Sequence, residues 1–226
     1  MRCYRKLGLP MGCLALIVGT VMAADGDPQA ILKQFVERGG RFSIDARRPG
    51  RPVVGIDLHR VEAGDADLAH LARFPDLETL DLSYTRVTDV GLRHLAHLPR
   101  LRRLFLHHTA IGDAGLVPVG RLAALQVLFL SGTQVTDRGL GQIQSLRKLE
   151  ALQLDATQVG DAGLLSLTTL THLRRLELGQ TAVTDAGLTH LAVLTRLQTL
   201  DLHRSRVTAG GVARLQKALP GTRITH

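Results

Sequence analysis

Leu77-Glu-Thr-Leu80-Asp-Leu82-Ser-Tyr-Thr85-Arg-Val87-Thr88-Asp89-Val-Gly91-Leu92 is the stretch that decides the fold, because near copies of it run through most of the chain. Its first leucine recurs at a spacing of 24 residues, and the series extends back to Val53 and lapses at Gly221. A fixed period of this length is typical of a solenoid, in which each small unit covers the apolar face of its neighbour. The leucines in register are Leu77, Leu101, Leu125, Leu149, Leu173 and Leu197.

Each unit predicts one strand, one turn and one helix. The opening Leu-x-x-Leu-x-Leu alternates, which predicts a strand whose leucines face the core. The helix after it has apolar positions such as Leu92, Leu95 and Leu98, and it returns the chain to the next strand. Because strands stack at about 4.8 Å and helices need about 8–10 Å, the coil must curve with its strands inside. We therefore expect an α/β fold: a right-handed solenoid in an open arc, with a parallel sheet on the concave face and helices on the convex face.

Two polar columns accompany the leucines, and each has a structural explanation. A threonine or serine follows each strand, and its hydroxyl is expected to satisfy backbone groups of the turn. An aspartate, preceded by Thr or Gly, marks each helix start, where Thr and Asp are expected to cap the helix and favour its positive end. A calcium stack would need closely spaced acids in Gly-rich turns, which these units lack. The columns are Thr85, Thr109, Thr133, Thr157, Thr181 and Ser205, and Asp89, Asp113, Asp137, Asp161 and Asp185.

The first residues have the layout of a secretory signal peptide. Three basic residues precede a short apolar run, and Val21-Met22-Ala23 supplies small residues for cleavage before the chain turns polar. The run is shorter than the ~20 residues that a membrane span needs, so a retained anchor is the weaker alternative. The predicted divisions are a signal peptide at residues 1–23, an N-terminal cap of one helix and one short strand at residues 27–52, and a domain of about seven units at residues 53–226.

The repeated phrase Leu-x-x-Leu-x-Leu-x-x-Thr-x-Val-Thr-Asp-x-Gly-Leu resembles the leucine-rich repeat superfamily, and the resemblance covers nearly all of the chain after the leader. More narrowly, Val183-Thr184-Asp185-Ala186-Gly187-Leu188 is similar to the repeats of exported bacterial leucine-rich repeat proteins. The resemblance implies protein–protein recognition and brings no catalytic residues with it. Val61, Asp67 and Ala209 depart from the pattern and make the first and last units atypical, as end units usually are.

Composition excludes several classes of function. Both cysteines, Cys3 and Cys13, lie in the leader, so the rest of the chain has no disulfide, thiolate metal site or cysteine nucleophile. Without the leader's three cations, 25 Lys and Arg stand against 20 Asp and Glu, and the two signs are interleaved. Proteins that bind nucleic acid usually gather positive charge on one face, so no specific nucleic-acid partner is expected. No other apolar stretch approaches membrane length, which predicts no transmembrane segment after leader removal.

Ten histidines raise the question of a metal site. His59, His107 and His203 share one strand position, but strands two units apart are about 10 Å distant, too far to share one zinc ion with Zn–N near 2 Å. The nearest mixed cluster, Asp57, His59 and Asp81, is expected to be a solvated polar face. Neither a metal nor a cofactor is predicted, and no nucleophile–base–acid motif indicates an enzyme.

The concave face carries the positions that do not repeat. The residue between the second and third leucines of each strand points outward, and on two adjacent strands it is Phe105 and Phe129, although the chain has only five Phe and two Tyr. Exposed aromatic clusters beside Arg resemble interface hot spots, whereas the alternative is cross-strand stacking that only stabilises the sheet. The predicted partner-binding residues are Tyr84, Arg103, Phe105, His107, Val127 and Phe129, flanked by acidic Asp57, Asp81, Glu177 and Asp201.

These observations predict a non-catalytic recognition scaffold that binds a protein or peptide through its concave strand face. The leader predicts export to the periplasm or the outside of a bacterial cell. Two alternatives stay open. One is binding of a glycan or anionic cell-wall polymer, which export and the net basic charge favour. The other is a purely structural role in the cell envelope.

Overall fold

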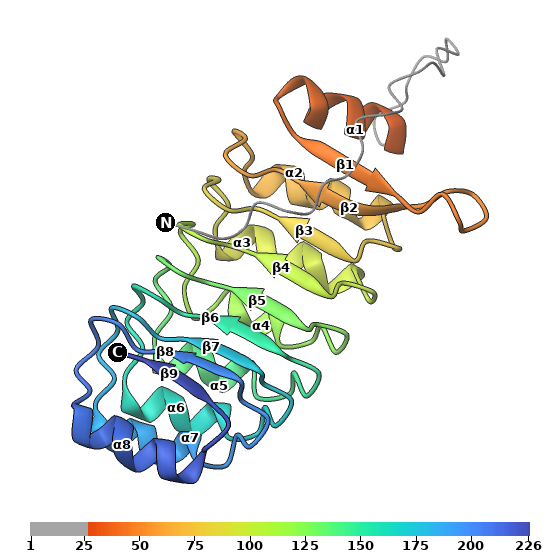
Figure 1. The fold of residues 1–226 in the computed structure, drawn as a ribbon. Coiled ribbons are helices and arrows are strands. Elements are labelled where there is room, and N and C mark those ends of the chain that lie inside the picture. Colours follow the sequence, from red (N-terminus) through yellow and green to blue (C-terminus); the bar gives the residue numbers. More distant parts are fainter. Residues whose placement is uncertain (1–26) are drawn as a thin grey trace.

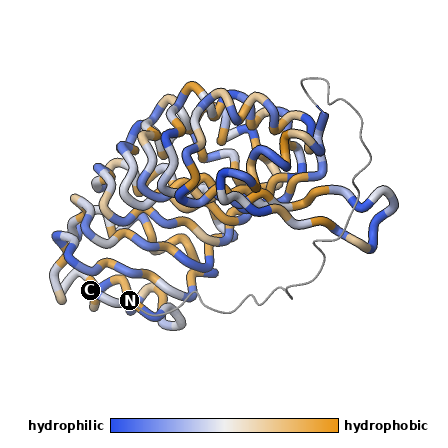
Figure 2. The backbone as a smooth tube through the Cα atoms, turned by 90° about the horizontal axis from the view of Figure 1, so that it is seen from above, coloured by the Kyte–Doolittle hydropathy of each residue, from blue (hydrophilic) through white to orange (hydrophobic). Residues whose placement is uncertain are grey.

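The computed structural model describes residues 27–226, which form one sheet backed by short helices (Figure 1). The strands follow one another in chain order from β1 to β9, and every neighbouring pair from β2 onward is parallel. The strands line one side of a curved ribbon and the helices line the other, as the view from above also shows (Figure 2). The predicted α/β solenoid is confirmed.

The elements are short because each 24-residue unit holds a strand, a turn and a helix. The strands are β1 (Arg41–Ile44), β2 (Val53–Asp57), β3 (Thr79–Asp81), β4 (Arg103–Phe105), β5 (Val127–Phe129), β6 (Ala151–Gln153), β7 (Arg175–Glu177), β8 (Thr199–Asp201) and β9 (Arg223–Thr225). The helices are α1 (Pro28–Glu37), α2 (Asp65–Ala69), α3 (Asp89–Leu92), α4 (Leu116–Val119), α5 (Asp137–Gln142), α6 (Asp161–Leu167), α7 (Asp185–Leu191) and α8 (Ala209–Ala218), with 3₁₀ helices η1 (His70–Arg73) and η2 (Arg93–His97).

Leucine fills the space between the sheet and the helices. The six leucines of the 24-residue series are at most 3% exposed, and the strand leucines such as Leu80 and Leu104 are fully buried. Burying one leucine side chain contributes about 1.5–3 kcal/mol, and much of that surface is covered by the next unit. Stability therefore comes from stacking units on one another.

The threonine column satisfies the turns, as the sequence predicts. The hydroxyl of Thr85 donates to the carbonyl of Leu82 at 2.6 Å, three residues earlier, and the other units repeat this bond. The five threonines of the column are buried, with Thr133 only 5% exposed, and Ser205 is partly buried. Because a buried carbonyl without a partner is costly, this hydroxyl does a structural job and is not free for chemistry.

The aspartate column corrects one expectation. Thr88 caps α3 through its side chain, which accepts the N–H of Val90 at 3.3 Å, and Asp89 is the first helical residue. The carboxylate of Asp89 does not close its own helix, however. It accepts the N–H of Gly112, in the next unit, at 2.7 Å. The aspartates therefore link successive units, and the N-cap of α3, α5, α6 and α7 is the residue before the aspartate, whereas α4 begins later, after Gly115.

A helix and an antiparallel strand precede the repeats. Asp27 accepts the N–H of Gln29 at 3.2 Å, Pro28 opens α1, and the helix buries Ile31, Leu32 and Phe35. β1 pairs antiparallel with β2, unlike every later pair. The helix and strand expected there are both present, whereas the predicted signal peptide, residues 1–23, lies outside the described residues. Within residues 27–226, no helix has the length and apolar character to cross a membrane.

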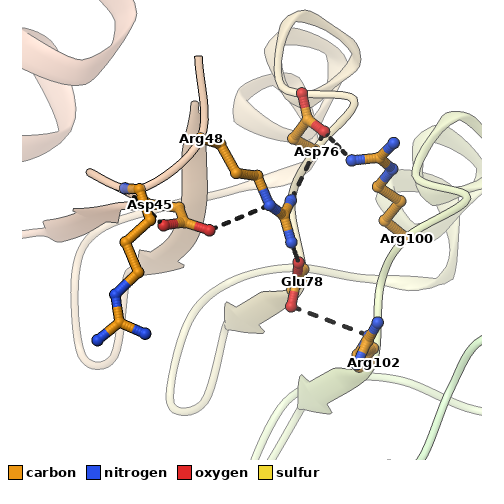
Figure 3. A network of polar contacts seen from close by, with 7 residues as sticks. Asp45, Arg48, Asp76, Glu78, Arg100 and Arg102 are labelled. Carbon is orange, nitrogen blue, oxygen red and sulfur yellow. Dashed lines mark hydrogen bonds and ion pairs between the residues drawn. The ribbon is translucent and has the colours of Figure 1, made fainter. Parts of the chain in front are cut away.

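An ion-pair network fastens the β1–β2 loop to the first repeats (Figure 3). The Arg48 guanidinium lies 3.0 Å from an oxygen of Asp45 and 2.6 Å from an oxygen of Glu78. It also lies 3.9 Å from Asp76, which pairs in turn with Arg100 of the next unit. One arginine therefore joins the loop to two units.

The last unit replaces a core leucine by a threonine. The leucine series lapses at Gly221, but the structure puts Thr222 in the leucine's place. The N–H of Thr222 donates to the carbonyl of Leu219 at 3.1 Å, as the N–H of Leu197 does to that of Leu194 at 2.9 Å. The Thr222 hydroxyl is buried and donates to the carbonyl of Leu197 at 2.7 Å.

Candidate functional site

The parallel register builds two rows of outward side chains across the strands. The residues on either side of the central strand residue, which is Ile56 in β2 and leucine in the later strands, align from β2 to β8, as the alternation predicts. A third row follows where the strands end. The first row is Gly55, Thr79, Arg103, Val127, Ala151, Arg175 and Thr199, and the second is Asp57, Asp81, Phe105, Phe129, Gln153, Glu177 and Asp201.

Three of the predicted site residues form one packed cluster. The rings of Phe105 and Phe129 meet edge to face, with centroids 5.1 Å apart, and His107 lies 5.4 Å from the ring of Phe129. Phe129 is only 7% exposed, whereas Phe105 and His107 are half-buried. The cluster thus presents Phe105 and His107 to solvent, with Phe129 supporting them from beneath.

Tyr84 belongs to a second ring cluster, on the turn after β3. Its ring stacks on His108 at 4.7 Å and meets His59 edge to face at 5.2 Å. The guanidinium of Arg60 lies 5.0 Å from the same ring, in a cation–π contact. Tyr84 is 43% exposed. The predicted site residues do not include the three neighbours of Tyr84, which are His59, Arg60 and His108. The one sequence signal for this cluster is the strand position that His59 shares with His107.

Tyr84 also belongs to a column of left-handed backbone positions that the sequence did not reveal. One residue per unit, just after the third row, has φ between 50° and 71°. In every unit but the last, its N–H donates to a carbonyl of the next unit, as from Tyr84 to His107 at 2.7 Å and from His108 to Ser131 at 2.9 Å. Only the glycine in the column suggests this conformation from sequence. The column is Arg60, Tyr84, His108, Gly132, Ala156, Gln180 and Arg204.

Arg103 and Val127 lie side by side in the first row, on β4 and β5. The Arg103 side chain is exposed, and its Nε donates to the hydroxyl of Thr79 at 2.9 Å. Val127 is partly exposed beside it. Arg103 therefore borders the Phe105 cluster with a guanidinium oriented by a neighbouring strand.

The flanking acids at the strand ends brace their own turns. A carboxylate oxygen of Asp57 accepts the N–H of His59 at 2.9 Å, and Asp81 accepts that of Ser83 at 2.8 Å. Asp201 does the same for His203 at 3.0 Å. Such side-chain-to-backbone bonds stabilise tight turns. Across residues 27–226, no group of three or more His, Cys, Asp or Glu is placed to hold a metal ion, and this includes the Asp57, His59 and Asp81 set.

Burial shifts two titrating groups on this face. Desolvation lowers the pKa of His107, with a smaller opposing effect of the Asp81 and Asp155 carboxylates, so this imidazole is neutral at neutral pH. Burial also raises the pKa of Glu177, and the nearby carboxylates of Asp155 and Asp201 act in the same direction. His107 therefore adds no charge at neutral pH to the aromatic part of the face, where Arg103 and the Asp81 carboxylate lie, and the part around β7 holds crowded carboxylates.

Comparison with known proteins gives the family. A family model described as a leucine-rich repeat region matches residues 58–220. Internalin C2 of Listeria monocytogenes has the same fold, with a TM-score of 0.58 and 22% identity over 76% of this chain and 81% of that one. A search of curated proteins found no match.

Two longer solved structures also match. An internalin (inlF) of Listeria monocytogenes has a TM-score of 0.52 and 19% identity, over 74% of this chain and 57% of that one. A leucine-rich repeat protein of Leptospira interrogans has a TM-score of 0.52 and 22% identity, over 70% and 45%. This chain thus spans about half the length of these two, and at such identities the similarity establishes the fold alone. Together with the family match over most of its length, this places the chain in the leucine-rich repeat family.

Proposed function

We propose that this chain is an exported, non-catalytic recognition scaffold that binds a protein or peptide through its concave sheet. Membership of the leucine-rich repeat family supports a role in protein interaction in general. The observation that supports the concave face is the pair of ring clusters around Tyr84 and Phe105, which lie on adjacent units. They gather three of the chain's seven Phe and Tyr residues on one part of that face.

The two clusters supply different parts of a binding surface. Tyr84 offers an exposed ring held in place by His108 and Arg60, which reduces the side-chain entropy lost when a partner binds. Phe105 and Val127 offer apolar contact, and Arg103 offers a guanidinium for a carbonyl or carboxylate of the partner. Rigid aromatic side chains next to Arg are the residue types that dominate binding energy at protein interfaces.

The arrangement around His107 does not support catalysis. Ser83 lies next to His107 in the third row, but its hydroxyl is buried and makes no hydrogen bond within residues 27–226. A serine nucleophile needs a base within hydrogen-bond reach, and this pair lacks that contact. Recognition without chemistry is therefore the better explanation of the polar residues on this face.

Site-specific photo-crosslinking tests the proposed surface. A benzophenone amino acid is introduced in place of Tyr84 or Phe105, with Leu165 of α6, 57% exposed on the helical face, as the control position. In a cell-envelope extract, we expect a discrete protein adduct from the two concave positions and none from the control. Adducts from Leu165 alone, or none from either concave position, would contradict concave binding.

Export is tested separately. Residues 1–23 fused to an alkaline phosphatase, which folds only outside the reducing cytoplasm, are expected to give phosphatase activity in a bacterial host. A fusion that starts at residue 27 is the matched control and should be inactive. An inactive full-leader fusion that is present as protein would show that the leader does not direct export.

A further inference from the structure

An open hollow lies at the start of the last strands. It measures about 570 Å³ and is bordered by Arg174, by the segment 195–198 before β8 and by the loop 218–222 before β9. A second hollow, of about 230 Å³, lies on the sheet surface and shares Arg174 and Gln198 with the first. The two hollows therefore adjoin at the amino ends of β7 and β8.

The larger hollow lies where the last unit has Thr222 in place of the core leucine, with Gly221 beside it. Gly221 stands where the leucine series lapses, and a Cβ built on it would have no heavy atom within 4 Å. Leu197 and Leu219 are buried at the same place and form an apolar floor. A group entering here therefore meets apolar surface below and polar side chains around the rim.

Positive charge dominates the rim. Arg174, Arg175 and Arg196 line the two hollows, and Glu150 is the one acidic residue lining them among the described residues. Glu150 lies 3.7 Å from Arg174, with both side chains about half exposed. Arg196 is exposed and makes no hydrogen bond or ion pair within residues 27–226. Guanidinium groups pair with carboxylates through two parallel hydrogen bonds, so the rim is suited to a carboxylate.

Negative charge lies immediately beyond the rim. Glu177 follows Arg175 by two residues on β7, about 6.6 Å along the strand, and the carboxylates of Asp155 and Asp201 are near Glu177. A uniformly anionic polymer lying across the sheet would meet these carboxylates and be repelled. An extended peptide that carries an acidic residue and, two positions later, a basic residue has charges complementary to both the arginine rim and the carboxylates around Glu177. The charge pattern thus favours a peptide over an anionic polysaccharide.

We propose that Arg174 and Arg196 bind a carboxylate of the partner, an extended peptide segment of mixed charge whose basic residue faces Glu177. This deepens the proposed function and rests on it, because it takes the partner to be a protein or peptide. The hollow at Gly221 accommodates the acidic side chain, and the aromatic clusters at the other end of the face contact a separate part of the partner.

The probe is a fluorescein-labelled peptide of repeated Glu-Gly-Lys-Gly, with binding to the full chain followed by fluorescence polarisation at low salt. The variant R174Q/R196Q removes the two guanidinium groups, and R93Q/R138Q, on the helical face, makes the same change of charge. We expect R174Q/R196Q to weaken binding about tenfold, since each exposed charge pair contributes up to a few-fold, and R93Q/R138Q to change it less than twofold. Gly221→Leu places a large side chain at the border of the hollow without changing an arginine, and it should weaken binding by a similar factor.

Other outcomes would overturn the proposal. The first is no measurable binding by the unaltered chain, and the second is equal losses of affinity in the two double variants. The third is full binding both by the Gly221→Leu variant and, separately, by the R174Q/R196Q variant. Dextran sulfate that binds more tightly than the peptide, and loses affinity in R174Q/R196Q, would assign the site to an anionic polysaccharide. Crosslinking at Tyr84 distinguishes a failure of this inference from a failure of the proposed function. If Tyr84 gives adducts but R174Q/R196Q does not change binding, the proposed function stands and only this inference is removed.

Discussion

Asp161 and Thr184 lie in successive units and are joined by two hydrogen bonds. One carboxylate oxygen accepts the N–H of Thr184 at 2.8 Å, and the other accepts its hydroxyl at 2.6 Å. The same threonine caps α7 by accepting the N–H of Ala186 at 3.2 Å. Asp161 therefore fixes the residue that starts the next helix, which makes the aspartate column a connection between units.

Removing the aspartate carboxylate should lower the free energy of unfolding more in one unit than in another. Asp161→Ala loses two hydrogen bonds, whereas Asp137→Ala loses only the bond from the N–H of Gly160, at 2.7 Å. At a partly exposed site we expect the free energy of unfolding to fall by about 2 kcal/mol for Asp161→Ala and about 1 kcal/mol for Asp137→Ala. Urea unfolding followed by circular dichroism measures both, and equal losses would show that the threonine hydroxyl contributes nothing.

The glycine two residues after each aspartate makes room for the previous unit's carboxylate. A Cβ on Gly187 would collide with the carboxylate of Asp161 and lie 3.0 Å from its Cα. Glycine to alanine in a helix usually stabilises by up to about 1 kcal/mol, but we expect Gly187→Ala to destabilise by about 1–3 kcal/mol. Gly141→Ala in α5, where the nearest atom is 3.9 Å away, is the control and should not destabilise. A stabilised Gly187→Ala variant would refute the steric explanation.

The period made the fold predictable, but not the contacts between units. A recurring leucine shows which face is buried in each unit, because the same residue must fill the same space. Whether Asp161 binds its own helix or the next unit depends on how far apart successive units lie, and one unit's sequence does not contain that distance. The collision at Gly187 cannot be read from one unit for the same reason, although the Asp-x-Gly spacing recurs in the five units from Asp89 to Asp185.

The sequence also did not show which residues have a left-handed backbone conformation. That column offers a test in which substitution by glycine should stabilise the folded protein. Ala156 has φ 53° and is exposed on the turn after β6. Left-handed backbone costs an alanine about 1–2 kcal/mol, more than the unfolded-state entropy that glycine adds. Ala156→Gly should therefore raise the free energy of unfolding by about 0.5 kcal/mol. Ala213→Gly in α8 should lower it by about 1 kcal/mol, and a loss in both variants would contradict the argument.

The candidate surface was predictable in its position and less so in its detail. Alternation along the strands placed Phe105 and Phe129 on the concave face, and the register makes them partners on adjacent strands. It did not indicate that Phe129 is covered, because the covering rings come from Phe105 and His107 in the adjacent unit. Nor could it pair Tyr84 with His108, since both lie on the left-handed turn that the sequence left unmarked.

Burial divides the aromatic residues between folding and recognition. Phe129 is 7% exposed and packs against two rings, so Phe129→Ala should lower the free energy of unfolding by about 2–3 kcal/mol. Tyr84 is 43% exposed, and Tyr84→Ala should cost less than about 1 kcal/mol. Thermal unfolding by circular dichroism distinguishes the two. Similar losses would mean that Tyr84 supports the fold as much as Phe129 does and is less available to a partner.

His107 makes this part of the sheet sensitive to acid. Burial lowers its pKa below the ordinary 6.5, while the unfolded chain keeps the ordinary value. Between those two values the unfolded state binds more protons, so stability falls as the pH drops from 6.5 toward the lowered pKa and is regained as the pH rises. Asp81 and Asp155 oppose the shift, and His59 and His108 reinforce it.

An NMR titration of the His107 ring proton should therefore give a midpoint below 6.5. His107→Gln removes the titrating group, so its free energy of unfolding should depend less on pH than that of the unaltered chain across this window. Tyr84→Ala leaves His107 in place and serves as the control, because it should keep the original pH dependence. A midpoint at or above 6.5 would show that the neighbouring carboxylates outweigh burial, and His107 would then present a charged ring to any partner on the concave face.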